Sequence, residues 1–139
     1  MFWLQPVQLV LCFGPLTYFA YCDLHTMSIP AYPLEVWTTI ICLYGAMRDW
    51  RLLAVALSTM AVVGLLAWST HGLGSADVLV MGALGACLGL SSVLLTILLA
   101  CGLGLAHSCW RHTRRIPFVP ALTLAGIVVV TVATLRRYL

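Results

Sequence analysis

The sequence predicts an all-α membrane protein, a polytopic bundle of about six transmembrane helices in a single domain over residues 1–139. Two observations support this prediction. Hydrophobic residues make up 63% of the chain and charged residues only 8%, too little charge to cover a water-soluble domain. A bilayer core of about 30 Å needs roughly 20 apolar residues per helical crossing, so the 139 residues hold about six crossings with short loops.

Polar or charged turns divide the chain into apolar runs that we interpret as helices. The runs cover about residues 2–21, 33–47, 52–68, 78–110 and 118–135. As one helix, the run at 78–110 would be about 50 Å long at roughly 1.5 Å per residue, which overshoots the bilayer. We therefore divide it at Gly89-Leu90-Ser91-Ser92 into a fourth and a fifth helix, and the last run becomes the sixth. The glycine spacing Gly85/Gly89 predicts a close approach between helices.

The order of the crossings places two aspartates on the same side of the membrane. Asp23 follows the first run, the second and third runs cross out and back, and Asp77 precedes the fourth. The fourth and fifth runs also cross out and back, so the segment Ile116-Pro117-Phe118 returns to that side. The arginines give no orientation, because three lie on the aspartate side and four on the other.

The chain has four acidic residues, and two of them have a simple local explanation. Asp49 lies between two arginines in a turn, where ion pairing accounts for it. Glu35 falls in the predicted first turn of the second helix, where an acid complements the helix dipole. Asp23 and Asp77 have no arginine within a helical turn. An ionisable group at membrane depth is costly, so both are candidates for a functional site.

Two carboxylates that share one site cannot both ionise cheaply, so one pKa rises and a proton is shared. The ionised partner then deprotonates a water molecule while the protonated partner polarises a peptide carbonyl, which cleaves an amide without a Ser, Cys or metal. The alternative is that Asp23 and Asp77 are helix caps in a small membrane scaffold or transporter. The spacing of the two residues leaves both interpretations open.

The residue pattern argues against several other functions. No basic tract with interleaved aromatic residues is present, so we expect no nucleic-acid partner. The six cysteines include no C-x-x-C, and the group His107, Cys109 and His112 has no common zinc spacing, so we expect no metal and no cofactor. The tryptophans fit an aromatic belt at the membrane interfaces. They are Trp3, Trp37, Trp50, Trp68 and Trp110.

Four short motifs follow one another along the chain. They are Asp23-Leu-His-Thr-Met-Ser-Ile29-Pro30, Gly74-Ser75-Ala76-Asp77, Ala83-Leu84-Gly85-Ala86-Cys87-Leu88-Gly89 and Ile116-Pro117-Phe118-Val119-Pro120. Together they resemble the motifs of the prepilin peptidases, the aspartic type IV leader peptidase family. The sequence departs from that pattern at three positions. Ala76 and Val119 stand where the family usually has Gly, and Leu79 stands where it usually has Lys.

The resemblance implies a multi-pass endopeptidase of the cell membrane that removes the leader of type IV prepilins or pseudopilins, in pilus or competence-pseudopilus biogenesis and secretion. It makes Asp23 and Asp77 the catalytic pair and gives the other motif residues binding or structural roles. It also places the connections at about 22–33, 69–77 and 106–117 in the cytoplasm. We expect no methyltransferase activity, because the N-terminal cysteine-bearing domain of longer enzymes is not found in this sequence. A noncatalytic relative that binds pilins remains an alternative.

Overall fold

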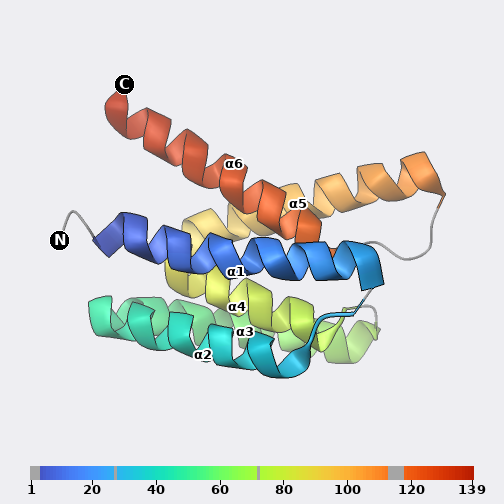
Figure 1. Ribbon diagram of the computed structural model, residues 1–139, viewed down its shortest axis with the longest axis horizontal. Coiled ribbons are helices and arrows are strands. Elements are labelled where there is room, and N and C mark those ends of the chain that lie inside the picture. Colours follow the sequence, from blue (N-terminus) through green and yellow to red (C-terminus); the bar gives the residue numbers. More distant parts are fainter. Residues whose placement is uncertain (1–3, 27, 72, 113–117) are drawn as a thin grey trace.

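The computed structural model describes residues 4–26, 28–71, 73–112 and 118–139. Every regular element in these parts of the chain is an α-helix, which confirms the predicted all-α fold (Figure 1). The helices are α1 (Leu4–Thr26), α2 (Ala31–Arg48), α3 (Trp50–Thr70), α4 (Ser75–Leu88), α5 (Leu90–Arg111) and α6 (Phe118–Tyr138). The predicted break near Gly89 is confirmed, since that residue separates α4 from α5.

Four of these helices are long and apolar enough, by length and composition, to cross a membrane: α1 from Pro6 onward, α3, α5 and α6. Helix α4 is apolar but has only 14 residues. At roughly 1.5 Å per residue it is about 21 Å long, less than the hydrocarbon core. Helix α2 has 18 residues and is not among the four. The number of helices therefore agrees with the prediction, whereas a full crossing is supported for four.

The helices extend further than the apolar runs that predicted them. Helix α1 continues through Asp23 to Thr26, and α5 continues to Arg111, so parts of the predicted loops are helical. Helix α2 begins at Ala31, after Pro30 at its N-cap. Proline fits the start of a helix because its φ is already helical and it lacks an N–H that would need a partner. This early start puts Glu35 beyond the first turn, so the dipole explanation for Glu35 is wrong.

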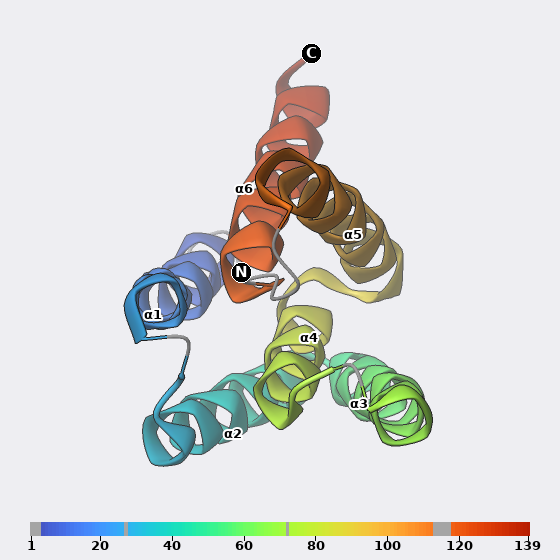
Figure 2. The same ribbon diagram turned by 90° about the vertical axis from the view of Figure 1, so that its right-hand side faces the viewer.

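Helix α4 lies at the centre of the bundle and contacts all five other helices (Figure 2). Seven consecutive residues of α4, 80–86, are buried, and four of these seven are Gly or Ala. Small side chains let neighbouring helices approach closely where lipid offers no hydrophobic driving force. At Gly85, for example, an added Cβ would lie 3.3 Å from Oγ1 of Thr59 in α3. The predicted close approach at Gly85 is therefore confirmed.

Gly89 has a different role from the one that the spacing predicts. An added Cβ at Gly89 would meet nothing within 4 Å, so no helix approaches there. Its φ is +82° and its ψ is 171°, a backbone conformation that is essentially restricted to glycine. The prediction of close packing at Gly89 is wrong, because this glycine instead allows the chain to end α4 and begin α5 at once.

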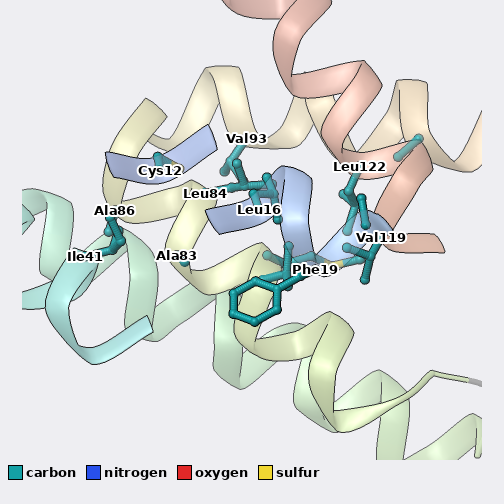
Figure 3. Close-up of a cluster of buried hydrophobic side chains, with 14 of the residues drawn as sticks. Cys12, Leu16, Phe19, Ile41, Ala83, Leu84, Ala86, Val93, Val119 and Leu122 are labelled. Atoms are coloured by element: carbon teal, nitrogen blue, oxygen red, sulfur yellow. The ribbon is translucent and has the colours of Figure 1, made fainter. Parts of the chain in front are cut away.

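The core surrounds α4 and receives side chains from every helix. Figure 3 shows Leu16 and Phe19 of α1 near Leu84 of α4 and Leu122 of α6. Trp37 of α2 belongs to this core, because it is buried, donates its Nε1–H to the Leu11 carbonyl at 3.1 Å and packs edge-on against Phe19. The aromatic-belt prediction is wrong for this tryptophan. The exposed tryptophans Trp50, Trp68 and Trp110 agree with a belt.

Few polar side chains are buried among the described residues. Four are threonines whose hydroxyls donate to the carbonyl four residues back, namely Thr38, Thr59, Thr96 and Thr123. The fifth is Gln8 of α1, which donates to the Ala86 carbonyl of α4 at 3.4 Å and accepts from the Arg48 guanidinium of α2. Gln8 thus joins three helices at the end of α1 that lies far from Asp23, a role that the sequence did not indicate.

Candidate active site

Three helix ends meet at one end of the bundle: the C-terminal end of α1 and the N-terminal ends of α4 and α6 (Figure 1). Asp23 lies in the last turn of α1, and Asp77 is the third residue of α4. The chain passes through α2 and α3 between them, which returns it to the same end. The two aspartates therefore lie at the same end of the bundle, as the parity of the crossings predicted.

Asp23 is partly buried, and the main-chain amide of Val119 interacts with its carboxylate. Val119 is the second residue of α6, where main-chain N–H groups have no partner within their own helix. An anion near the C-terminal end of α1 is opposed by the dipole of that helix. Asp23 therefore does not cap its own helix, and its carboxylate faces the start of another.

Asp77 lies in the first turn of α4, after the N-cap residue Gly74. Burial and, to a smaller extent, the nearby Asp23 carboxylate raise the pKa of Asp77 to about 6, against the opposing effect of the Gly74 amide. A carboxylate at a helix N-terminus ordinarily stays ionised because the dipole and the free amides stabilise its charge. Here the loss of hydration on burial has a larger effect on the pKa of Asp77 than the dipole and the amides have. Asp77 therefore holds a proton more readily than an exposed aspartate does.

The Asp23 carboxylate lies near enough to Asp77 to add to the rise of its pKa, although burial raises that pKa more. Each also meets the amide at the start of a helix, Val119 for one and Gly74 for the other. Such a pair favours the state that holds one proton and one negative charge, with an acid beside a base. This arrangement can take a proton from water and give one to a carbonyl oxygen.

The other motif residues divide between the site and the scaffold. Ile29, just before α2, and Ala76 of α4 line a pocket at the first turns of α4, and Pro30 is the N-cap of α2. Phe118 is partly buried and begins α6, next to the amide that meets Asp23. The predicted residues Ile116 and Pro117 lie outside the described residues.

Gly85 lies eight residues after Asp77, which is about 12 Å along a helix at roughly 1.5 Å per residue. Gly85 therefore serves helix packing, and the still more distant Gly89 allows the chain to reverse direction between α4 and α5. Both glycines lie away from the carboxylates. Of the predicted binding or structural residues, the ones near the pair are Gly74 and Ala76, close to Asp77 in the chain, and Phe118, next to the Val119 amide.

The pocket has a volume of about 530 Å³ and lies between α2, α3 and α4, and Asp77 is not part of its lining. Its lining is mostly apolar and includes Leu79, the position where the family usually has Lys. Glu35 also lines it, which the sequence analysis did not foresee. The signal for Glu35 in the sequence is an acidic residue within an otherwise apolar run. The predicted start of the second helix accounts for that acid without a pocket.

The fold and the site together define a helical membrane protein with an interacting carboxylate pair at one end of its bundle. The sequence model of the type IV leader peptidase family matches residues 10–109. The match spans 100 residues (109 − 10 + 1) of the 139 and includes both Asp23 and Asp77. The chain belongs to the type IV leader peptidase family, and its function is of the leader peptidase type. No curated protein and no solved structure matches it with significance.

Proposed function

We propose that this protein is an aspartic endopeptidase that cleaves the leader from type IV prepilins or prepilin-like pseudopilins, with water activated between Asp23 and Asp77. The observation that carries the proposal is that α1 and α4 bring these two carboxylates to the same end of the bundle, near enough for Asp23 to contribute to the raised pKa of Asp77. Family membership supports leader peptidase chemistry in general. The carboxylate pair supplies a way to perform it without a nucleophilic side chain.

In the proposed reaction, Asp77 starts protonated and Asp23 starts ionised. Asp23 takes a proton from water, and the resulting hydroxide attacks the scissile carbonyl carbon while Asp77 gives its proton to the carbonyl oxygen. The tetrahedral intermediate then collapses. Asp23 gives its proton to the leaving amine as the C–N bond breaks, and Asp77 recovers a proton from the intermediate. Both aspartates return to their starting states, so one water molecule is consumed for each bond cleaved.

The two main-chain amides keep the pair ready for this cycle. The amide of Val119 interacts with the Asp23 carboxylate and offsets part of the cost of burying its charge. The amide of Gly74 interacts with the Asp77 carboxylate and limits the rise of its pKa, which leaves that group able to release its proton. The amides thereby fix both side chains before the substrate arrives, which reduces reorganisation during the reaction.

The position of the pair at a helix end supports a scissile bond near the membrane boundary. Asp23 lies in the last turn of α1 and Asp77 in the first turn of α4, so an extended substrate segment there reaches both from the aqueous side. In this proposal the protein lies in the cell membrane with the aspartate end toward the cytoplasm, and its partners are prepilins or pseudopilins and the surrounding lipid.

A prepilin cleavage assay in membranes tests the proposal. We expect wild type to shorten the pilin, and we expect Asp23→Asn and Asp77→Asn each to lower the rate by at least about 100-fold, the usual range for general acid–base groups. The matched control is Asp49→Asn, because Asp49 lies in the turn between α2 and α3, at the other end of α2 from the pair. This control should cleave at close to the wild-type rate.

Membrane insertion of each variant is checked by its recovery in the membrane fraction and its helical circular dichroism. If both aspartate variants insert and still cleave at the wild-type rate, the capping interpretation replaces the catalytic one. If wild type cleaves none of several candidate prepilins, the noncatalytic interpretation is favoured. Leu79, at the position of the usual Lys, would then be the first residue to change.

A further inference from the structure

A groove lies between α5 and α6, at the end of the bundle opposite the carboxylate pair. It has a volume of about 270 Å³ and is lined by the N-terminal half of α5 and the C-terminal half of α6. The two helices approach at Gly126 of α6, where an added Cβ would lie 3.8 Å from Cγ2 of Thr96 in α5. Beyond this point the last turns of α6 diverge from the first turns of α5, and the groove lies where they diverge (Figure 1).

The groove is polar at its outer end and apolar along the rest of its length. On α5, Leu95 and Leu99 follow Ser91 at spacings of four residues, which puts the three on one stripe of the helix. On α6, Val132 precedes Arg136 by the same spacing. Helix α5 begins and α6 ends at this end of the bundle, so the serine and the arginine lie at the outer end. The aliphatic side chains extend from there for about 12 Å toward the middle of the helices.

The apolar walls of the groove are open to the surroundings of the bundle. Leu95 is 49% exposed, Leu99 is 38% exposed and Val132 is 48% exposed. Helices α5 and α6 are each long and apolar enough to cross a membrane, so lipid chains surround these side chains in a bilayer. The volume lies below the roughly 300–1,000 Å³ of pockets for drug-sized molecules, which suits a single narrow chain.

Arg136 supplies the only charge among the described residues that line the groove. No acid is found among them, so the lining gives the guanidinium no ion-pair partner. A guanidinium matches the geometry of a phosphate because it donates two parallel hydrogen bonds, and the hydroxyls of Ser91 and Ser92 at the same outer end can donate to further oxygens. A lone cation favours a ligand with a net negative charge over a zwitterion, whose ammonium group would find no acid here.

We infer that this groove binds an anionic glycerophospholipid, with the phosphate at Arg136 and one acyl chain between α5 and α6. The order of groups in such a lipid, a charged headgroup followed by an apolar chain, is the order of the side chains along the groove. A soluble phosphate would leave the aliphatic walls uncovered, and an apolar peptide would leave Arg136 without a partner. The inference does not rest on the proposed function, because the groove and the carboxylate pair lie at opposite ends of the bundle.

Lipid titration of the full chain in detergent tests the inference. Lipid that copurifies is removed, and native mass spectrometry then measures the affinity for dioleoyl phosphatidylglycerol and for dioleoyl phosphatidylcholine, which differ only in the headgroup. We expect the first phosphatidylglycerol molecule to bind about fivefold more tightly, the effect of one basic side chain on an anionic lipid. Glycerol 3-phosphate should not displace it, because that molecule has no chain to cover the apolar walls.

Two pairs of variants assign the binding to the groove. Arg136→Gln should abolish the preference for phosphatidylglycerol. Arg137→Gln should keep it, since Arg137 is the next residue of α6 and carries the same charge but does not line the groove. Val132→Trp should weaken the binding of both lipids by filling the groove, whereas Leu124→Trp, at an exposed position of α6 outside the groove, should weaken neither. Circular dichroism checks that each variant retains its helices.

Equal loss of the preference in the two arginine variants would overturn the inference, since the lipid would then be attracted by the general charge of the helix end. Equal affinity of the wild-type protein for the two lipids would also overturn it, and so would equal effects of the two tryptophan variants. Displacement by glycerol 3-phosphate would show a site for a soluble phosphate ester instead. The measurement involves no cleavage, so its outcome is independent of the proposed function.

Discussion

Asp23 and Asp77 lie at opposite ends of their helices, and the helix dipole acts on them with opposite signs. Asp77, in the first turn of α4, is in a position where an anion is stabilised, whereas Asp23, in the last turn of α1, is in one where it is not. Asp49 shows what simple capping looks like in this chain. Its carboxylate accepts from the Arg51 amide at 3.0 Å and caps α3.

The raised pKa of Asp77 makes the stability of the protein depend on pH. The pKa is about 6 in the folded protein, above the ordinary value of 3.8. The folded state therefore holds this proton more tightly than the unfolded state, and stability is lost as pH rises from about 4 to about 6. Asp77→Asn removes this loss. We expect the melting temperature of the variant, relative to wild type, to rise by a few degrees across that interval and then to level off.

Thermal unfolding in detergent between pH 4 and pH 8, followed by circular dichroism, measures the difference. Because Asp77 is only partly buried, water screens part of its charge, and the shift should be smaller than full burial would give. A difference between variant and wild type that stays constant over the whole pH interval would contradict the raised pKa.

At the scale of elements, α4 differs from its neighbours because protein surrounds it along most of its length. Its residues 80–86 are all buried, so it shows no separate polar and apolar faces. It contacts every other helix, and it ends at Gly89 in a conformation that side chains rarely adopt. The placement of Asp77 therefore depends on the contacts that α4 makes with the other helices and on the end of α4 at Gly89.

Two glycines form a matched test of that ending. An added Cβ meets nothing within 4 Å at either Gly89 or Gly102, but only Gly89 has a positive φ. We expect Gly89→Ala to destabilise the protein by about 1–3 kcal/mol, the usual cost of a strained backbone conformation. Gly102→Ala, within α5, should be neutral or stabilising by up to about 1 kcal/mol. Unfolding measured for both variants decides the point, and equal effects would contradict it.

At the scale of the whole molecule, the connections between helices alternate between the two ends of the bundle. Helices α1, α3 and α5 run toward the aspartate end, and α2, α4 and α6 run away from it (Figure 1). The C-terminal end of α6, with Arg136 and Arg137, lies away from that end (Figure 1). The side of the membrane that each end faces follows from the proposed function, because the charges do not orient the bundle.

Topology reporters test this orientation. A reporter fused after Arg137 should report the non-cytoplasmic side, and a reporter fused after Arg111, at the end of α5, should report the cytoplasm. The paired fusions control for expression, since they differ by one helix. A cytoplasmic signal after Arg137 would overturn the proposed orientation even if cleavage is observed.

The sequence by itself determined the number of helices, the break at Gly89 and the parity that brings Asp23 and Asp77 to one end. These features are local, because polar turns interrupt apolar runs and each crossing reverses the direction of the chain. The four motifs also predicted the family, which the match over residues 10–109 confirms. The extent of the domain, the catalytic roles and the substrate remain predictions that the experiments above address.

Only the tertiary structure decided which residues meet. The Val119 amide at Asp23, the burial of Trp37 and the place of Glu35 in the pocket all depend on helices that are distant in sequence. In a soluble protein, hydrophobic periodicity would indicate the buried face of each helix. In a membrane bundle the lipid is as apolar as the core, so a face that packs and a face that meets lipid have similar compositions, and only the packing tells them apart.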